Sequence, residues 1–136
     1  MKLHYEIDGE NFTAAGEASG DVKRKLKVAG FPSDFIRRVS IAMYEGEINT
    51  VIHGGGGFAD VEILDDKVVI ELQDKGPGIP DVEKAMQAGF STAPDSVRAL
   101  GFGAGMGLPN MKKYSDEMEI ETEVGKGTLV RMIINF

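Results

Sequence analysis

The chain has 136 residues, 42% of them hydrophobic and 27% charged, which fits one folded domain and excludes a disordered chain. It contains no cysteine, so a disulfide framework and a thiolate metal site are excluded, and its net charge of −7 argues against broad binding to nucleic-acid phosphates. No apolar run is long enough to span a bilayer, and the N-terminus is too polar for a secretory signal. We therefore expect a single domain, residues 1–136, in the cytoplasm.

Hydrophobic periodicity along the chain predicts an order of β-α-α-β-β-α-α-β-β. Ser33 is a plausible N-cap of the second helix. The expected strands are residues 2–7, 58–65, 67–74, 117–124 and 128–136, and the expected helices are residues 12–28, 33–53, 81–87 and 108–114. Residues 88–107 show no clear period, which is typical of a lid, a binding loop or disorder. This order predicts an α+β fold, a two-layer sandwich with a mostly antiparallel sheet and helices on one face.

The stretch Asp74-Lys75-Gly76-Pro77-Gly78-Ile79 follows the apolar part of a predicted strand. It places a carboxylate at the strand end, directly before glycines that let another molecule approach the main chain closely. One carboxylate beside bare backbone suits a flat ring that carries an amino donor, such as adenine. An ordinary surface turn is the alternative interpretation of this composition.

A polar stripe runs along the predicted second helix. Glu45, Asn49 and His53 are spaced i, i+4, i+8 and share one side of that helix, with apolar residues on both flanks. An unpaired carboxylate is costly to bury, so Glu45 at such a place needs a metal, a water or a substrate hydroxyl as its partner. Alternatively, Glu45 is a rim residue that is hydrogen-bonded to the backbone, and His53 is a cap at the helix end. Glu47 points elsewhere and is expected to be a solvated charge.

Glycine occupies every second position of residues 101–107, directly before the predicted helix at 108–114. Exposed amides at a glycine-rich helix start can cradle phosphates. The segment lacks the Gly-Lys-Ser/Thr ending of a P-loop and the strand context of a dinucleotide-binding turn, and a flexible hinge is the alternative. The three stretches together form a much narrower combination than any one of them alone.

These stretches resemble the sequence boxes of the superfamily of gyrase, the 90-kDa heat-shock chaperone, histidine kinases and mismatch-repair ATPases (GHKL). Residues 45–49 are similar to the first box, Glu-x-x-x-Asn, and residues 74–79 to the second. Residues 101–108, with Gly125-Lys126-Gly127-Thr128, are similar to the remaining ones. Residues 81–92 look like the stretch that follows the second box in small bacterial anti-sigma and partner-switching serine kinases. The resemblance covers nearly all of residues 33–136 and implies a Bergerat-type ATP-binding fold.

The resemblance also implies a role for each matching position. Asn49 would hold Mg²⁺ against the triphosphate, and Glu45 would be the general base toward the attacking hydroxyl or water. Asp74 would accept the adenine amino group, and residues 91–101 would form the lid. No role is assigned to the glycines at 54–57. The ATP-binding residues implied in this way are Asn49, His53, Asp74, Gly76, Gly78, Ile79, Ser91, Thr92, Gly101, Gly103, Gly105, Met106, Gly107, Leu108 and Thr128.

The function that the resemblance implies is an ATP- and Mg²⁺-dependent protein serine/threonine kinase in transcription regulation. Its expected target is a small STAS-type anti-anti-sigma protein, with a sigma factor as a further partner. The alternative is a nucleotide-gated module that binds a regulator with little or no phosphotransfer, and a slow ATPase is a third option. The intact Glu45/Asn49 pair favours the kinase. Direct contact with nucleic acid or membrane is not expected, and a homodimer stays open because no dimer seam is readable.

Overall fold

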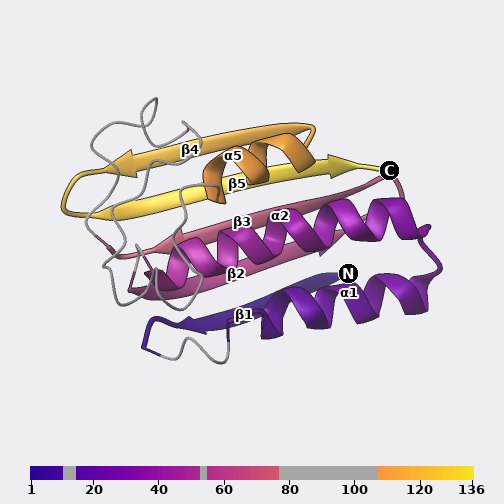
Figure 1. The fold of residues 1–136 in the computed structure, drawn as a ribbon, viewed down its shortest axis with the longest axis horizontal. Helices are drawn as coiled ribbons and strands as arrows, with labels where there is room; N and C mark the ends of the chain where they lie inside the picture. The colour runs from indigo at the N-terminus through magenta and orange to yellow at the C-terminus, as the bar shows by residue number, and fades with distance from the viewer. Residues whose placement is uncertain (11–14, 53–54, 77–106) are drawn as a thin grey trace.

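The computed structural model describes residues 1–10, 15–52, 55–76 and 107–136, and this part folds into two layers (Figure 1). One layer is a five-stranded sheet and the other consists of helices. The strands are β1 (Lys2–Asp8), β2 (Gly56–Ile63), β3 (Lys67–Asp74), β4 (Glu117–Glu123) and β5 (Gly127–Asn135). The described helices are α1 (Glu17–Ala29), α2 (Ser33–Ile52) and α5 (Gly107–Tyr114).

The sheet has the strand order β1-β2-β3-β5-β4, and each of its neighbouring pairs is antiparallel. β3 therefore lies at the centre, between β2 and β5. Register places Val61, Ile70 and Met132 side by side on one face of the three central strands. Alternate residues of a strand point to opposite faces, so these positions define the face that packs on the helices.

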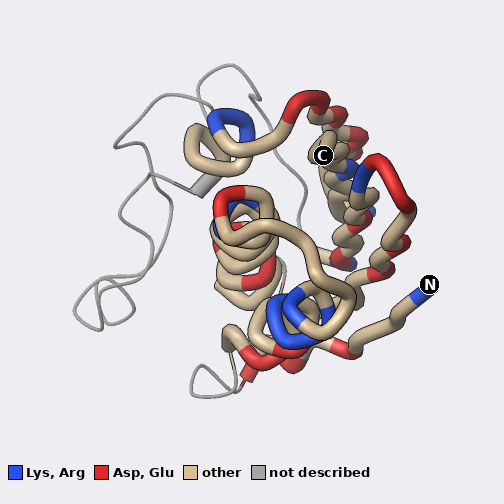
Figure 2. The backbone as a smooth tube through the Cα atoms, turned by 90° about the vertical axis from the view of Figure 1, so that its right-hand side faces the viewer, with Lys and Arg blue, Asp and Glu red and all other residues tan. Residues whose placement is uncertain are grey.

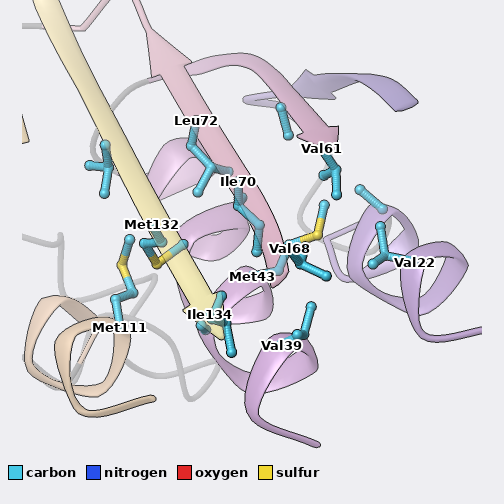
Figure 3. Close-up of a cluster of buried hydrophobic side chains, with 14 of the residues drawn as sticks. Val22, Val39, Met43, Val61, Val68, Ile70, Leu72, Met111, Met132 and Ile134 are labelled. Atoms are coloured by element: carbon cyan, nitrogen blue, oxygen red, sulfur yellow. The ribbon is translucent and has the colours of Figure 1, made fainter. Parts of the chain in front are cut away.

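The hydrophobic core lies between this sheet face and the helices. Figure 2 shows the helices stacked on one side of the sheet. Figure 3 shows Val39 and Met43 of α2 in one cluster with Ile70 of β3 and Met132 of β5, all of them fully buried. The predicted α+β sandwich with a mostly antiparallel sheet and helices on one face is thus confirmed.

The other sheet face carries acidic side chains, since the strand register aligns Asp60 of β2, Glu71 of β3 and Glu119 of β4 across it. On β4 the exposed positions are Glu117, Glu119, Glu121 and Glu123, which alternate with half-buried residues that face the helices. None of the described helices is long and apolar enough to cross a membrane.

Several predicted boundaries change in the structure. α1 begins at Glu17 rather than near residue 12, because its N-cap Gly16 has φ 102°, outside the helical region. The carbonyl of Pro32 accepts the first α2 bond, from the Ile36 amide at 3.1 Å, so Ser33 is already inside the helix and is not its cap. β2 begins two residues early, at Gly56. The predicted helix at 81–87 and most of the aperiodic stretch lie outside the described residues.

Candidate functional site

The carboxylate of Asp74 is fixed at the C-terminal end of β3 by two backbone amides. Its Oδ1 atom accepts hydrogen bonds from the Gly76 amide at 2.9 Å and from the Thr128 amide at 3.2 Å. Both bonds fall on the same oxygen. In the described part of the chain, Oδ2 is therefore the atom that can accept a bond from a ligand.

Glycines lie on both strands beside this carboxylate. Gly57 of β2 is paired with Asp74, and a Cβ added to Gly57 would collide with the carbonyl oxygen of Gln73. A Cβ added to Gly127 of β5 would collide with the carbonyl oxygen of Asp74, and Gly127 also has φ 119°. Neither neighbouring strand can accept a side chain at these two positions. Gly57 belongs to the glycine run at 54–57, and the close approach of β3 explains why this position of the run is glycine.

Thr128 contributes to this arrangement mainly through its main chain. Its side chain is buried, with 6% of its surface exposed, and its hydroxyl pairs with the hydroxyl of Thr122 at 2.9 Å. The Thr122 hydroxyl also donates to the Gly127 carbonyl at 3.3 Å. These bonds fix the start of β5, and with it the amide that holds Asp74.

The turn of α2 that carries Glu45 and Asn49 packs directly over β3. A Cβ on Gly46 would collide with a methyl group of Leu72 and would lie 3.2 Å from Met111 Cε of α5, so only glycine permits this close approach. Leu72 and Asp74 are two residues apart on β3 and face the same side of the sheet. The C-terminal ends of α2 and β3 also lie at the same end of the molecule (Figure 1).

Glu45 and Asn49 are both half-buried, as the predicted stripe required. Burial raises the pKa of the Glu45 carboxyl, and a hydrogen bond from Asn110 opposes that rise. This bond runs from Asn110 Nδ2 on α5 to Glu45 Oε1 and is 3.4 Å long. Asn110 was not among the residues predicted from the sequence, although it lies in the first turn after the glycine-rich segment.

The prediction that Glu47 is a solvated charge was wrong. Only 3% of its surface is exposed, and its carboxylate accepts hydrogen bonds from the amides of Gly16, Ala18 and Ser19. These amides belong to the N-terminus of α1, where backbone donors have no partner within the helix. A helical projection of α2 alone cannot show that α1 begins beside Glu47.

Comparison with known proteins identifies the family. The sequence profile of the histidine kinase-like ATPase domain matches residues 12–134. The chain belongs to the histidine kinase-like ATPase family. This result confirms the resemblance to the superfamily that contains the histidine kinases.

Individual relatives of this ATPase-family chain narrow the comparison. The chain is 43% identical to an anti-sigma F factor of Caldanaerobacter subterraneus subsp. tengcongensis over 102 residues, which are 71% of this chain and 68% of that protein. It is 32% identical to the serine/threonine-protein kinase RsbT of Bacillus subtilis over 127 residues, 90% of this chain and 87% of that protein. These relatives confirm the predicted resemblance to partner-switching regulators.

A solved structure with little sequence identity shows the same fold. The structure of the SiaB–SiaC complex from Pseudomonas aeruginosa contains a chain that superimposes with a TM-score of 0.64 at 14% identity. The match covers 97% of this chain and 88% of the other.

The described residues include only part of the ATP-binding set expected for this family. Gly76 and Thr128 each bond to Asp74. Leu108 places its side chain in the core, so only its main chain can reach a phosphate. Gly107 is the first residue of α5. The expected residues outside the described part are His53, Gly78, Ile79, Ser91, Thr92, Gly101, Gly103, Gly105 and Met106.

A metal ion at this site would depend on ligands besides acidic and histidine side chains. Over the described ranges, no three His, Cys, Asp or Glu side chains are grouped so that they could hold a metal. Magnesium bound to a nucleotide needs only one or two protein ligands, because phosphate and water oxygens complete its octahedron. A single carboxamide oxygen, as on Asn49, fits that requirement.

Proposed function

We propose that this chain is an ATP- and Mg²⁺-dependent protein serine/threonine kinase of the partner-switching type. The observation that carries the proposal is that the turn of α2 with Glu45 and Asn49 packs, through Gly46, on the strand that ends in the fixed carboxylate of Asp74. Family membership and the relative RsbT, whose name is that of a serine/threonine-protein kinase, support it.

Asp74 recognises the adenine of ATP. Two amides hold Oδ1 in place, so Oδ2 accepts the hydrogen bond from the amino group of the ring without reorientation. A charged acceptor forms a stronger bond with such a donor than a neutral one does. Gly57 and Gly127 carry no side chain because the backbone of β3 lies where a Cβ would stand. Gly76, whose amide bonds to Asp74, adds bare backbone directly after β3.

Asn49 would hold Mg²⁺ through its carboxamide oxygen. When bound, the ion neutralises phosphate charge. The glycine-rich segment before α5 holds the phosphates through its amides, and the main chain of Leu108 belongs to the same cradle. The positive end of α5 adds to this attraction for anions.

Glu45 is the general base. It takes the proton from a serine or threonine hydroxyl of the target as the hydroxyl oxygen bonds to the γ-phosphorus, and the bond to the β-phosphate oxygen breaks to release ADP. A pKa raised by burial suits this role, because a base with a pKa nearer neutrality binds a proton more readily. Asn110 orients the carboxylate through its bond to Oε1.

The target is a small STAS-type anti-anti-sigma protein, and a sigma factor is the second partner. The names of the relatives support this assignment, because most of them are anti-sigma factors. We place the protein in the cytoplasm, where such partners act. A homodimer is compatible with this role.

A nucleotide-gated anti-sigma module without phosphotransfer is the second candidate. The abundance of relatives named for sigma-factor binding favours it. Both candidates need Asp74 and Asn49, but only the kinase needs Glu45.

Incubation with γ-labelled ATP and the STAS-type protein of the same organism separates the two candidates. The kinase predicts label on a serine or threonine of the target with wild-type protein and none with Glu45→Ala. Glu71→Ala is the matched control, because it removes an acidic side chain from the open sheet face, where Arg131 is its partner. Binding of ATP with no transfer to the target would support the module and contradict the kinase.

A further inference from the structure

We propose that Glu47 is a positioning residue of the nucleotide site. It ties the N-terminus of α1 to the turn of α2 that carries Glu45 and Asn49, and so sets how Asn49 meets the magnesium-bound nucleotide. The inference rests on the proposed function and adds to it a residue that does not touch the ligand.

Three backbone hydrogen bonds fix the carboxylate of Glu47. Its Oε2 accepts bonds from the Gly16 amide at 2.9 Å and the Ala18 amide at 3.2 Å, and its Oε1 accepts one from Ser19 at 3.1 Å. No cation of the described residues pairs with this buried carboxylate. Buried charges require hydrogen bonds, and here α1 supplies them at its positive end.

Glu47 points away from the site residues on its own helix. It lies two positions after Glu45 and two before Asn49, and two residues correspond to about 200° of rotation around an α-helix. Glu45 and Asn49 therefore share one side of α2, and Glu47 lies on nearly the opposite side. α1 therefore contacts this turn on the side of Glu47, and the site residues lie on the opposite side.

Other contacts fix the same turn from further directions. Gly46 rests against Leu72 of β3 and Met111 of α5, and Glu45 is bonded to Asn110 of α5. A Cβ added to Gly16, the residue whose amide bonds to Glu47, would lie 3.1 Å from the ring of Tyr44. α1 and α2 lie side by side (Figure 1). A helix turn moves as one rigid unit. Loss of the contact between Glu47 and α1 therefore lets the whole turn rotate, and Asn49 moves with it.

The variants separate positioning from simple stability. Glu47→Gln keeps the size of the side chain but removes its charge and turns one acceptor into a donor that faces backbone amides. Glu47→Asp keeps the charge on a shorter side chain, and it is the variant to measure if the Gln protein does not fold. Val22→Ala is the matched control, because it weakens the buried packing of α1 and removes none of the amides that bond to Glu47.

The measurement is the ADP affinity with Mg²⁺ divided by the affinity with EDTA, obtained by calorimetry on protein shown to be folded by circular dichroism. We expect this ratio to fall about fivefold or more in Glu47→Gln, the low end of couplings between sites in proteins. Affinity in EDTA should stay within about twofold, because Asp74 and Thr128 are untouched. Without nucleotide, hydrogen exchange at the Ala18 and Ser19 amides should become faster in the Glu47 variants.

Each outcome is decisive. A ratio that falls in the Glu47 variants and not in Val22→Ala supports positioning. An unchanged ratio in a folded Glu47 variant, or an equal fall in Val22→Ala, overturns it. Absence of nucleotide binding by the wild-type protein would instead overturn the proposed function, and this inference with it, while the exchange rates would still report the contact between Glu47 and α1.

Discussion

Replacement of Asp74 by asparagine isolates adenine recognition from folding. The Oδ1 atom of asparagine can still accept the bonds from the Gly76 and Thr128 amides, which are 2.9 and 3.2 Å long in the wild-type protein. The amide NH₂ group then takes the place of Oδ2. A donor would face the donor of the adenine ring, while the end of β3 would keep its structure.

The size of the effect follows from the bond that is lost. Hydrogen bonds to charged groups contribute about 1.5–3 kcal/mol, so the variant should lose at least ~1.4 kcal/mol of binding free energy, or about tenfold in affinity. The free energy of unfolding should change by less than about 1 kcal/mol, because both backbone donors remain satisfied.

Calorimetric titration with ADP and with GDP tests this reasoning. Guanine presents a carbonyl oxygen where adenine presents its amino group, so the wild-type protein should prefer ADP and Asp74→Asn should lose that preference. Asp66→Asn, the same substitution in the turn between β2 and β3, should leave both affinities unchanged. An unchanged ADP affinity in a folded Asp74→Asn protein would refute the adenine assignment.

Two further predictions concern the turn of α2. Gly46→Ala should destabilise the fold by about 1–3 kcal/mol in urea denaturation, because its Cβ collides with the buried Leu72 side chain. Leu72→Ala should then lower the free energy of unfolding less in the Gly46→Ala background than in the wild type. Strictly additive losses of free energy would contradict the contact. Glu45→Gln should be more stable than the wild type at about pH 7, and this advantage should shrink toward pH 4. The reason is that burial raises the pKa of the Glu45 carboxyl above its ordinary 4.5 in the folded state. Such a group stabilises the fold at low pH and loses that contribution as the pH rises. A difference in the free energy of unfolding that does not vary with pH would show that burial does not perturb Glu45.

The sequence predicted the features that depend on local pattern. The i, i+4 spacing of Glu45 and Asn49 put them on one side of a helix, and the apolar run before Asp74 put its carboxylate at the end of a strand. The layered α+β architecture followed from the order of the elements.

The features that the sequence did not predict depend on contacts between distant segments. Glu47 looked like a surface charge because its partners lie 28 to 31 residues earlier in the chain. Asn110 reaches Glu45 across 65 residues, and Gly57 matters only because β3 passes beside it. One signal was available for Gly57, since a glycine run that opens a strand indicates a close approach of backbones.

The proposed function requires that a purine nucleotide and magnesium bind in one pocket beside Asp74 and Asn49. Isothermal titration of the purified chain with ADP, with Mg²⁺ and with EDTA, tests that claim directly. We predict saturable binding that Mg²⁺ strengthens in the wild-type protein, with Asn49→Ala losing the magnesium effect and Asp74→Asn losing most of the affinity. No saturable binding of ADP in either buffer by the folded wild-type protein would contradict it.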